Sequence, residues 1–167
     1  MRTMQLCAMT LLGALALGSA AQADPVMATP PDGPAYAVSD ANVGATPIAG
    51  ESVYQAFHGK EGIDRITASL VQSYKSDPRI KDIFATADDQ RLVRLLGEEI
   101  CYVIGGPCHY TGRDMKTAHA NMGVQNADFN ALVEDLQKAM DTEQVPFWAQ
   151  NKLLAKLAPM QRVVVTR

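Results

Sequence analysis

The sequence predicts an all-α fold, because its apolar residues recur at helical spacing and strong helix stop and start signals separate the runs. From Glu51 onward, apolar side chains step by three or four residues in each of four segments. The chain has 167 residues, 47% of them hydrophobic. That is enough for one core and too little for two ordinary domains, so we expect a single helical domain.

The first two predicted helices lie before and after a loop that begins at Asp77-Pro78, where the proline stops the first helix. The apolar face of the first helix carries Ile63, Ile66, Leu70 and Tyr74. The second helix spans about residues 88–104 and ends at Gly105-Gly106-Pro107. Its apolar face carries Leu92, Leu95, Leu96, Ile100 and Val103.

Two more helices follow. One starts at Asn126, which suits the N-cap position, and the last starts near Pro146, which suits a first helical turn. Their apolar residues are Phe129, Leu132, Val133, Leu136, Met140, Trp148, Leu153, Leu154 and Leu157. We expect Pro159 to kink or shorten the last helix. The run at 163–165 could form a strand, but a lone strand has no partner, so the class remains all-α.

The first 23 residues have the pattern of an export signal. Arg2 gives a positive start, residues 8–17 are almost wholly apolar, and Ala21 and Ala23 form an Ala-x-Ala cleavage site. The apolar run is too short to span a bilayer, and no run of about 20 apolar residues follows it. We therefore expect cleavage between Ala23 and Asp24, a periplasmic or secreted protein, and no membrane span after cleavage.

Residues 24–50 are rich in proline, alanine and glycine and poor in large apolar residues. Such a segment buries too little surface to order itself, so we expect a disordered linker before a folded domain at 51–167. The formal net charge is −3. The chain therefore lacks the basic footprint of a nucleic-acid-binding protein, and we expect no nucleic-acid partner.

The segment at 108–123 has little helical periodicity and many special residues, which is typical of a functional loop. It holds two of the three histidines, His58, His109 and His119. There is no Cys-x-x-Cys-His motif for covalent haem, no His-Glu-x-x-His motif for zinc, and no nucleophilic triad. A lone histidine is by default a surface residue or a satisfied core residue. The residues around each histidine therefore decide whether it is a candidate ligand.

His119 closes a short predicted helix at 116–119, and Met115 lies one turn earlier on the same face. A single neutral imidazole is the ordinary proximal ligand of haem iron and leaves the other axial position open to a gas. Its second ring nitrogen then needs a hydrogen-bond acceptor that fixes the tautomer. Arg113 and Lys116 are close enough in sequence to pair with haem propionates. Apolar residues that could line the ring are Met115, Val124 and Phe129.

From Glu51 to Val164 the sequence resembles the truncated globins, in particular their group 1-like members. The matching residues are Val53, Tyr54, Gly59, Ile63, Asp77, Pro78, Arg79, Ile80, Phe84, Gly105, Gly106, Pro107, Tyr110, Thr111, Gly112, Arg113, Asp114, Met115, Lys116, His119, Val124, Phe129, Val145 and Pro146. The resemblance implies a two-over-two helical sandwich around a non-covalent haem b. It also implies that His119 is the proximal ligand, that Phe84 packs on the ring, and that Met115 and Phe129 form pocket walls.

The departures from the family pattern concern the ligand side of the haem. Val71 stands where the family usually has a tyrosine, and Leu92 and Leu96 stand where a glutamine often serves. Bound O2 carries partial negative charge and needs hydrogen-bond donors, which these side chains lack. We therefore expect NO or CO to be favoured relative to O2. Tyr74 or Tyr102 could supply a hydroxyl, but we favour packing with each hydroxyl at the surface.

Cys101 and Cys108 are the cysteines that remain after signal cleavage. On one unbroken helix they would be about 10 Å apart, too far for a bond. The break at Gly105-Gly106-Pro107 lets the loop fold back, so we expect a disulfide, with two buried thiols as the alternative.

The preferred function is reversible binding of a diatomic gas, O2, NO or CO, at a five-coordinate haem iron, without a committed catalytic residue. The alternatives are a haem redox protein or NO- or peroxide-detoxifying enzyme with an electron donor, and a haem-free helical interaction module.

Overall fold

The computed structural model describes residues 27–28 and 36–167. Its elements are β1 Met27–Ala28, β2 Tyr36–Ala37, η1 Asp40–Val43, α1 Ser52–Ala56, α2 Gly59–Ser76, η2 Lys81–Phe84, α3 Asp89–Val103, α4 Met115–Ala118, α5 Asn126–Thr142, α6 Phe147–Leu157, η3 Ala158–Met160 and α7 Gln161–Val164. The two short strands pair antiparallel, with Met27 opposite Ala37. The all-α fold class is confirmed.

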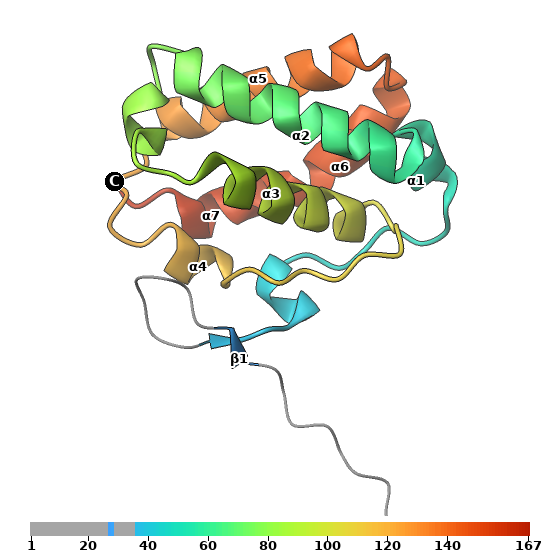
Figure 1. Ribbon diagram of the computed structural model, residues 1–167, viewed down its shortest axis with the longest axis horizontal. Helices are drawn as coiled ribbons and strands as arrows, with labels where there is room; N and C mark the ends of the chain where they lie inside the picture. Colours follow the sequence, from blue (N-terminus) through green and yellow to red (C-terminus); the bar gives the residue numbers. More distant parts are fainter. Residues whose placement is uncertain (1–26, 29–35) are drawn as a thin grey trace, which may run out of the picture.

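The helices form two layers. In Figure 1, α2 and α5 make the upper layer, and α3 lies below them with α6 and α7. α2 packs against both α3 and α5, and α3 also contacts α6. The short helix α4 lies below the lower layer in this view and contacts α7. No helix in the described part of the chain is long and apolar enough to cross a membrane.

Local sequence signals place the helix ends close to where the sequence predicts them. α2 ends at Ser76, directly before Asp77-Pro78. Asp88 caps α3 by accepting a hydrogen bond from the Arg91 backbone N–H at 2.8 Å. α5 begins at Asn126, but its cap is Gln125, whose backbone N–H donates to the Asp128 carboxylate at 2.9 Å. The cap therefore lies one residue before the predicted Asn126 cap.

Of the run at 163–165 that could have formed a strand, Val163 and Val164 are helical and Val165 is extended. α6 ends at Leu157, and Pro159 lies in the following 3-10 turn, which agrees with its expected effect on the helix. Residues 161–164 form α7, in which Val164 is buried. Burial of this side chain against the helical layers replaces the missing strand partner.

Residues 36–50 lie on the domain, although the sequence assigns them to a disordered linker at 24–50. Val43 is fully buried, and the Ile48 N–H donates to the Val103 carbonyl oxygen at 2.8 Å. The Tyr36 hydroxyl donates to the Thr111 carbonyl oxygen at 2.9 Å. These contacts with segments distant in sequence hold residues that composition alone leaves without a core of their own. The expected signal peptide at 1–23 lies outside the described residues.

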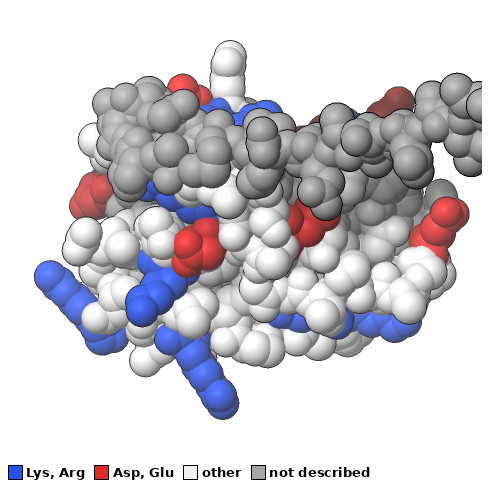
Figure 2. All heavy atoms as spheres, turned by 90° about the horizontal axis from the view of Figure 1, so that it is seen from below, with Lys and Arg blue, Asp and Glu red and all other residues white. Residues whose placement is uncertain are grey.

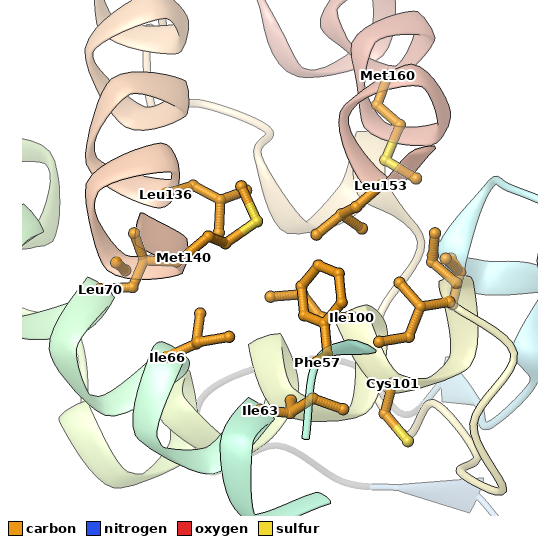
Figure 3. Close-up of a cluster of buried hydrophobic side chains, with 14 of the residues drawn as sticks. Phe57, Ile63, Ile66, Leu70, Ile100, Cys101, Leu136, Met140, Leu153 and Met160 are labelled. Carbon is orange, nitrogen blue, oxygen red and sulfur yellow. The ribbon is translucent and has the colours of Figure 1, made fainter. Parts of the chain in front are cut away.

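The core lies between the layers, where side chains from all the long helices meet (Figure 3). Phe57, Ile66 and Leu153 are each fully buried there. Close packing of this kind fixes the relative positions of the helices, and therefore the shape of any cavity between them.

Candidate functional site

One large cavity opens between the helical layers. Its volume is about 150 Å³, or about 1000 Å³ of space free of atoms when the open solvent at its mouth is counted. Its lining comes from α2, η2, α3, α4, α5, α6 and the C-terminal turns. The residues are Leu70, Tyr74, Ile80, Ile83, Phe84, Leu92, Leu96, Glu99, Ile100, Met115, His119, Met122, Val124, Asp128, Phe129, Leu132, Val133, Leu136, Leu157, Met160 and Val164. The polar side chains among them are few, so the cavity suits a large apolar ligand.

His119 enters this cavity from the end of α4. Asp114 starts the helix, because its carboxylate accepts a hydrogen bond from the Thr117 N–H at 3.0 Å. His119 Nδ1 lies 2.8 Å from the Met115 carbonyl oxygen. A carbonyl oxygen only accepts, so Nδ1 carries the proton in the neutral ring and Nε2 keeps a free lone pair. That is the arrangement in which an imidazole ligates a metal.

α3 supplies another wall of the cavity. Leu92, Leu96 and Glu99 are spaced by four and three residues, so they share one face of this helix. Glu99 is half-buried and makes no hydrogen bond or ion pair within the described residues. Burial alone raises the pKa of its carboxyl group to about 7. The helical spacing could have revealed Glu99 from the sequence, since it interrupts the apolar stripe on this face.

Tyr74 lines the cavity from α2 and is 1% exposed, so the expectation of a hydroxyl at the surface is wrong for this residue. Its ring stacks on Phe84, with centroids 4.8 Å apart. Burial, together with the charges of Glu99 and Asp135, raises the Tyr74 pKa well above its usual value, so the phenol stays neutral. Stacking on Phe84 draws the ring inward.

The remaining sequence-predicted residues divide into two groups. The cavity lining includes Phe84, Met115, Val124, Phe129, Leu92 and Leu96. It does not include Val71, which is buried beside it, or Tyr102, which is half-buried. Nor does it include the expected propionate partners. Arg113 is half-buried with its guanidinium 5.8 Å from the Tyr36 ring centroid, and Lys116 is exposed.

Several lining residues have no local signal that marks them in the sequence. Met122, Leu157, Met160 and Val164 reach the cavity because the loop after α4 and the C-terminal turns close over it. The C-terminus is held there by the Thr166 N–H, which donates to the Val124 carbonyl oxygen at 2.9 Å. Contacts between segments this far apart in sequence are set by tertiary packing.

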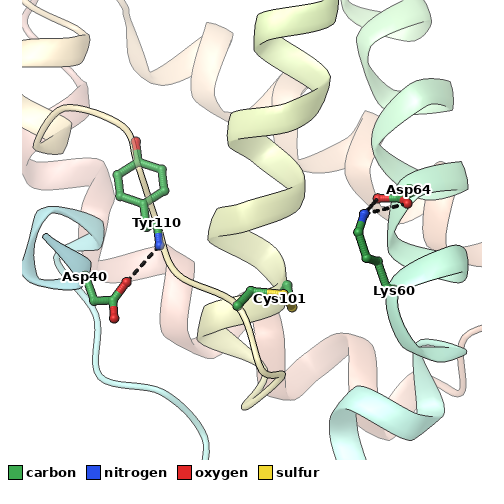
Figure 4. The surroundings of a disulfide bond; sticks show 6 residues. Asp40, Lys60, Asp64, Cys101 and Tyr110 are labelled. Carbon is green, nitrogen blue, oxygen red and sulfur yellow. Dashed lines mark hydrogen bonds and ion pairs between the residues drawn. A yellow bond between two sulfur atoms is a disulfide. The ribbon is translucent and has the colours of Figure 1, made fainter. Parts of the chain in front are cut away.

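The structure joins Cys101 and Cys108 by a disulfide with their Cα atoms 5.8 Å apart (Figure 4). The intervening turn needs its glycines. Gly105 has φ +82°, and a Cβ there would lie 2.4 Å from the Ile48 carbonyl oxygen. A Cβ on Gly106 would lie 2.6 Å from the Cys101 Sγ. Beyond the bond, Asp40 accepts from the Tyr110 N–H at 2.7 Å and holds the loop to η1.

The described residues fit a haem b. The cavity is large and apolar, an aromatic pair lies along it, and one imidazole presents a free nitrogen with its tautomer fixed. Two layers of helices around such a cavity define a globin.

Comparison with known proteins agrees with that class. The family model for bacterial-like globins matches residues 52–166, so the chain belongs to the bacterial-like globin family. It is a haem-binding globin of the kind that binds diatomic gases, with non-covalent haem b as its cofactor. The haem-free alternative therefore has no support.

Curated relatives are truncated hemoglobins. The group 1 truncated hemoglobin of Tetrahymena pyriformis is 27% identical over 86 residues, which are 52% of this chain and 71% of the relative. The group 1 truncated hemoglobin GlbN of Mycolicibacterium paratuberculosis is 24% identical over 115 residues, or 69% and 85% of the two chains.

Solved structures share the fold. The T. pyriformis truncated hemoglobin in its Fe(III) form has a TM-score of 0.66 at 22% identity, covering 69% of this chain and 98% of that one. The 2/2 hemoglobin of Synechococcus sp. PCC 7002 has a TM-score of 0.62 at 21% identity, covering 70% and 99%. The predicted two-over-two sandwich is confirmed.

Proposed function

We propose that this chain is an exported globin in which Nε2 of His119 would hold the haem iron, and that the bound haem would take up a neutral diatomic gas. The observation that carries the proposal is the 2.8 Å contact of His119 Nδ1 with the Met115 carbonyl oxygen, in a ring that lines the apolar cavity. It fixes the tautomer that ligation needs before any metal arrives.

The rest of the cavity supports the same proposal by its chemistry. Phe84 and Phe129 offer flat apolar surface, and Met115 and Val124 fill the space near His119. Arg113 and Lys116, the cations expected at the propionates, lie outside the cavity lining, so that pairing would need Arg113 to leave the Tyr36 ring. When bound, haem would supply the iron that binds the gas.

The choice of gas follows from the wall that α3 presents. Leu92 and Leu96 give bound O2 no hydrogen-bond donor, and each missing bond costs about 1–3 kcal/mol. NO and CO depend less on such donors, so we expect both to bind well. Tyr74, whose neutral phenol lines the cavity from α2, is the donor left for O2, so retention of O2 should depend on its hydroxyl.

The location of the protein is part of this proposal. Residues 1–23 have the pattern of an export signal, and an oxidising compartment would keep Cys101 and Cys108 bonded. Mature protein from a periplasmic fraction should start at Asp24 and show no thiol that reacts before reduction. An intact N-terminus, or two reactive thiols in the native protein, would contradict this part.

The decisive experiment compares the wild type with two histidine variants. It records the absorption spectrum of each protein in the ferric, ferrous and ferrous-CO states. The wild type and His109→Ala should bind haem stoichiometrically and shift the Soret band with CO. His109 is the matched control, because its imidazole is 87% exposed and pairs with Asp40 outside the cavity. His119→Ala should lose stoichiometric haem, and full haem content in that variant would show the ligand assignment to be wrong.

A further inference from the structure

Glu99 is a carboxylate in a cavity that is otherwise almost entirely apolar. It projects from the face of α3 that also carries Leu92 and Leu96. No residue described in this structure donates a hydrogen bond to it or pairs with it as a cation. A carboxylate that faces an apolar cavity without a partner loses hydration at a cost in free energy. We therefore expect Glu99 to have a function in the ligand cavity.

The ionisable groups around Glu99 offer it no positive charge. Tyr74 faces it from α2 and Tyr110 from the loop after the disulfide, and both feel its charge. α5 contributes two acids, Asp128 in the cavity wall and Asp135 behind it.

Asp135 is the second of these acids, and Lys138 offsets part of its charge. It is 3% exposed, its Oδ1 accepts from Lys138 Nζ at 3.1 Å, and its Oδ2 is buried without a partner in the described chain. From α4 comes His119, which we assign to iron, and the C-terminal turns contribute only Leu157, Met160 and Val164. No lysine or arginine is among the described residues that line the cavity. The charged side chains in the lining are therefore acidic, and they make the electrostatic potential inside the cavity negative.

We propose that Glu99 sets the ligand selectivity of the haem cavity by charge, because its carboxylate repels anionic ligands of the ferric iron and acts far less on an uncharged ligand such as CO. This inference rests on the proposed function. A fixed negative charge in a site of low dielectric acts strongly on a second charge, whereas an uncharged diatomic ligand experiences no net Coulomb force.

The selectivity should depend on pH near neutrality. Burial raises the pKa of Glu99 to about 7, so the side chain is neutral in mildly acidic solution and ionised in mildly basic solution. Anion repulsion should therefore be absent below neutrality and present above it. Ionisation also stabilises ferric over ferrous iron, so the midpoint potential should fall as pH rises through this range.

The test measures azide binding to the ferric protein and CO binding to the ferrous protein at pH 5.5 and pH 8.5, with the azide constant corrected for the spectroscopically measured hydroxide form. Glu99→Gln should bind azide on the order of tenfold more tightly than wild type at the higher pH and equally at the lower pH. CO affinity should change less than about twofold at both. Glu99→Asp should restore the discrimination, because it keeps the charge.

Glu61→Gln is the matched control, since it removes the same charge from an exposed site in the first turn of α2. Glu99→Leu completes the apolar stripe and should fold well, so it serves as a second variant that keeps haem. A wild type without haem would remove the proposed function and this inference together. Normal haem and CO binding, with azide affinities in both Glu99 variants equal to Glu61→Gln at both pH values, would overturn the role of Glu99 alone.

Discussion

The cavity is bounded by two regions that are built in different ways. α4 is four residues long and is held by local contacts, namely the Asp114 cap and the bond from His119 to Met115. α3 is fifteen residues long and is held by packing against α2 and α6. The side that we assign to iron ligation is therefore held by local contacts in addition to its packing on α7, and the side that α3 forms mainly by the core.

The surface shown in Figure 2 has no large patch of one charge among the described residues. On the face drawn in Figure 2, acidic and basic side chains are interspersed with uncharged atoms, apart from the part that grey atoms cover. Mixed charge of this kind gives no extended field of one sign. We therefore place the charge-based selectivity inside the cavity, at Glu99, and not on this face.

The largest effect should come from the packed region. Ile66 on α2 is fully buried and does not line the cavity (Figure 3). Ile66→Ala should lower the free energy of unfolding by about 2–5 kcal/mol, because it removes buried methyl groups and leaves a void. Urea denaturation of the CO complex measures this.

The folded fraction of Ile66→Ala should keep a normal ferrous-CO spectrum, because His119 depends on local contacts. An altered spectrum at full folding would show that the two regions are coupled more tightly than their contacts suggest.

An intermediate effect should come from the bond that ties the two regions together. Cys101 lies in α3 and Cys108 in the loop that leads to α4. Replacing both by alanine should cost about 2–3 kcal/mol of stability, since the bond closes a loop of eight residues in the unfolded chain. Reduction of the wild type should lower the unfolding midpoint similarly and leave the double variant unchanged. Equal midpoints for all samples would contradict a stabilising role.

The same contrast explains what the sequence could predict. The ends of α2, α3 and α6 follow from prolines and caps, which are local signals. The sequence also predicted that the second nitrogen of His119 needs an acceptor, and the structure identifies that acceptor as the Met115 carbonyl. Tyr74 lies on the apolar face of α2 with Ile63 and Leu70, so local spacing predicts its burial, and the expectation of a surface hydroxyl failed against that spacing. Its stacking on Phe84, which lies outside this helix, was not visible in the sequence.

The ordered structure of residues 36–50 could not be predicted from the composition of that segment, because it depends on contacts with distant residues. The composition of the segment predicts disorder, yet Val43 and Ile48 find places on a surface made by distant segments. Glu99 is a different case, because its spacing from Leu96 was visible in the sequence. Only the cavity shows that this face of α3 meets a ligand site rather than solvent.

The smallest effect should come from the locally held region. The Asp114 carboxylate is exposed and bonds to Thr117, which lowers its pKa below the usual 3.8. Asp114→Ala should therefore cost about 1 kcal/mol or less of stability at neutral pH. A carboxyl group whose pKa is lower in the folded state stabilises above the unfolded value and loses that effect as pH falls through the folded one.

The difference between wild type and Asp114→Ala should thus shrink as pH is lowered below about 3.8. Asp114→Asn is the control, because it keeps an uncharged cap and should show a pH-independent difference from Asp114→Ala. Although its stability effect is small, Asp114→Ala should speed haem loss from the ferric protein more than Ile66→Ala does, since it loosens the turn that carries His119. The reverse order of haem loss would mean that the core, and not the cap, holds the ligating side of the cavity.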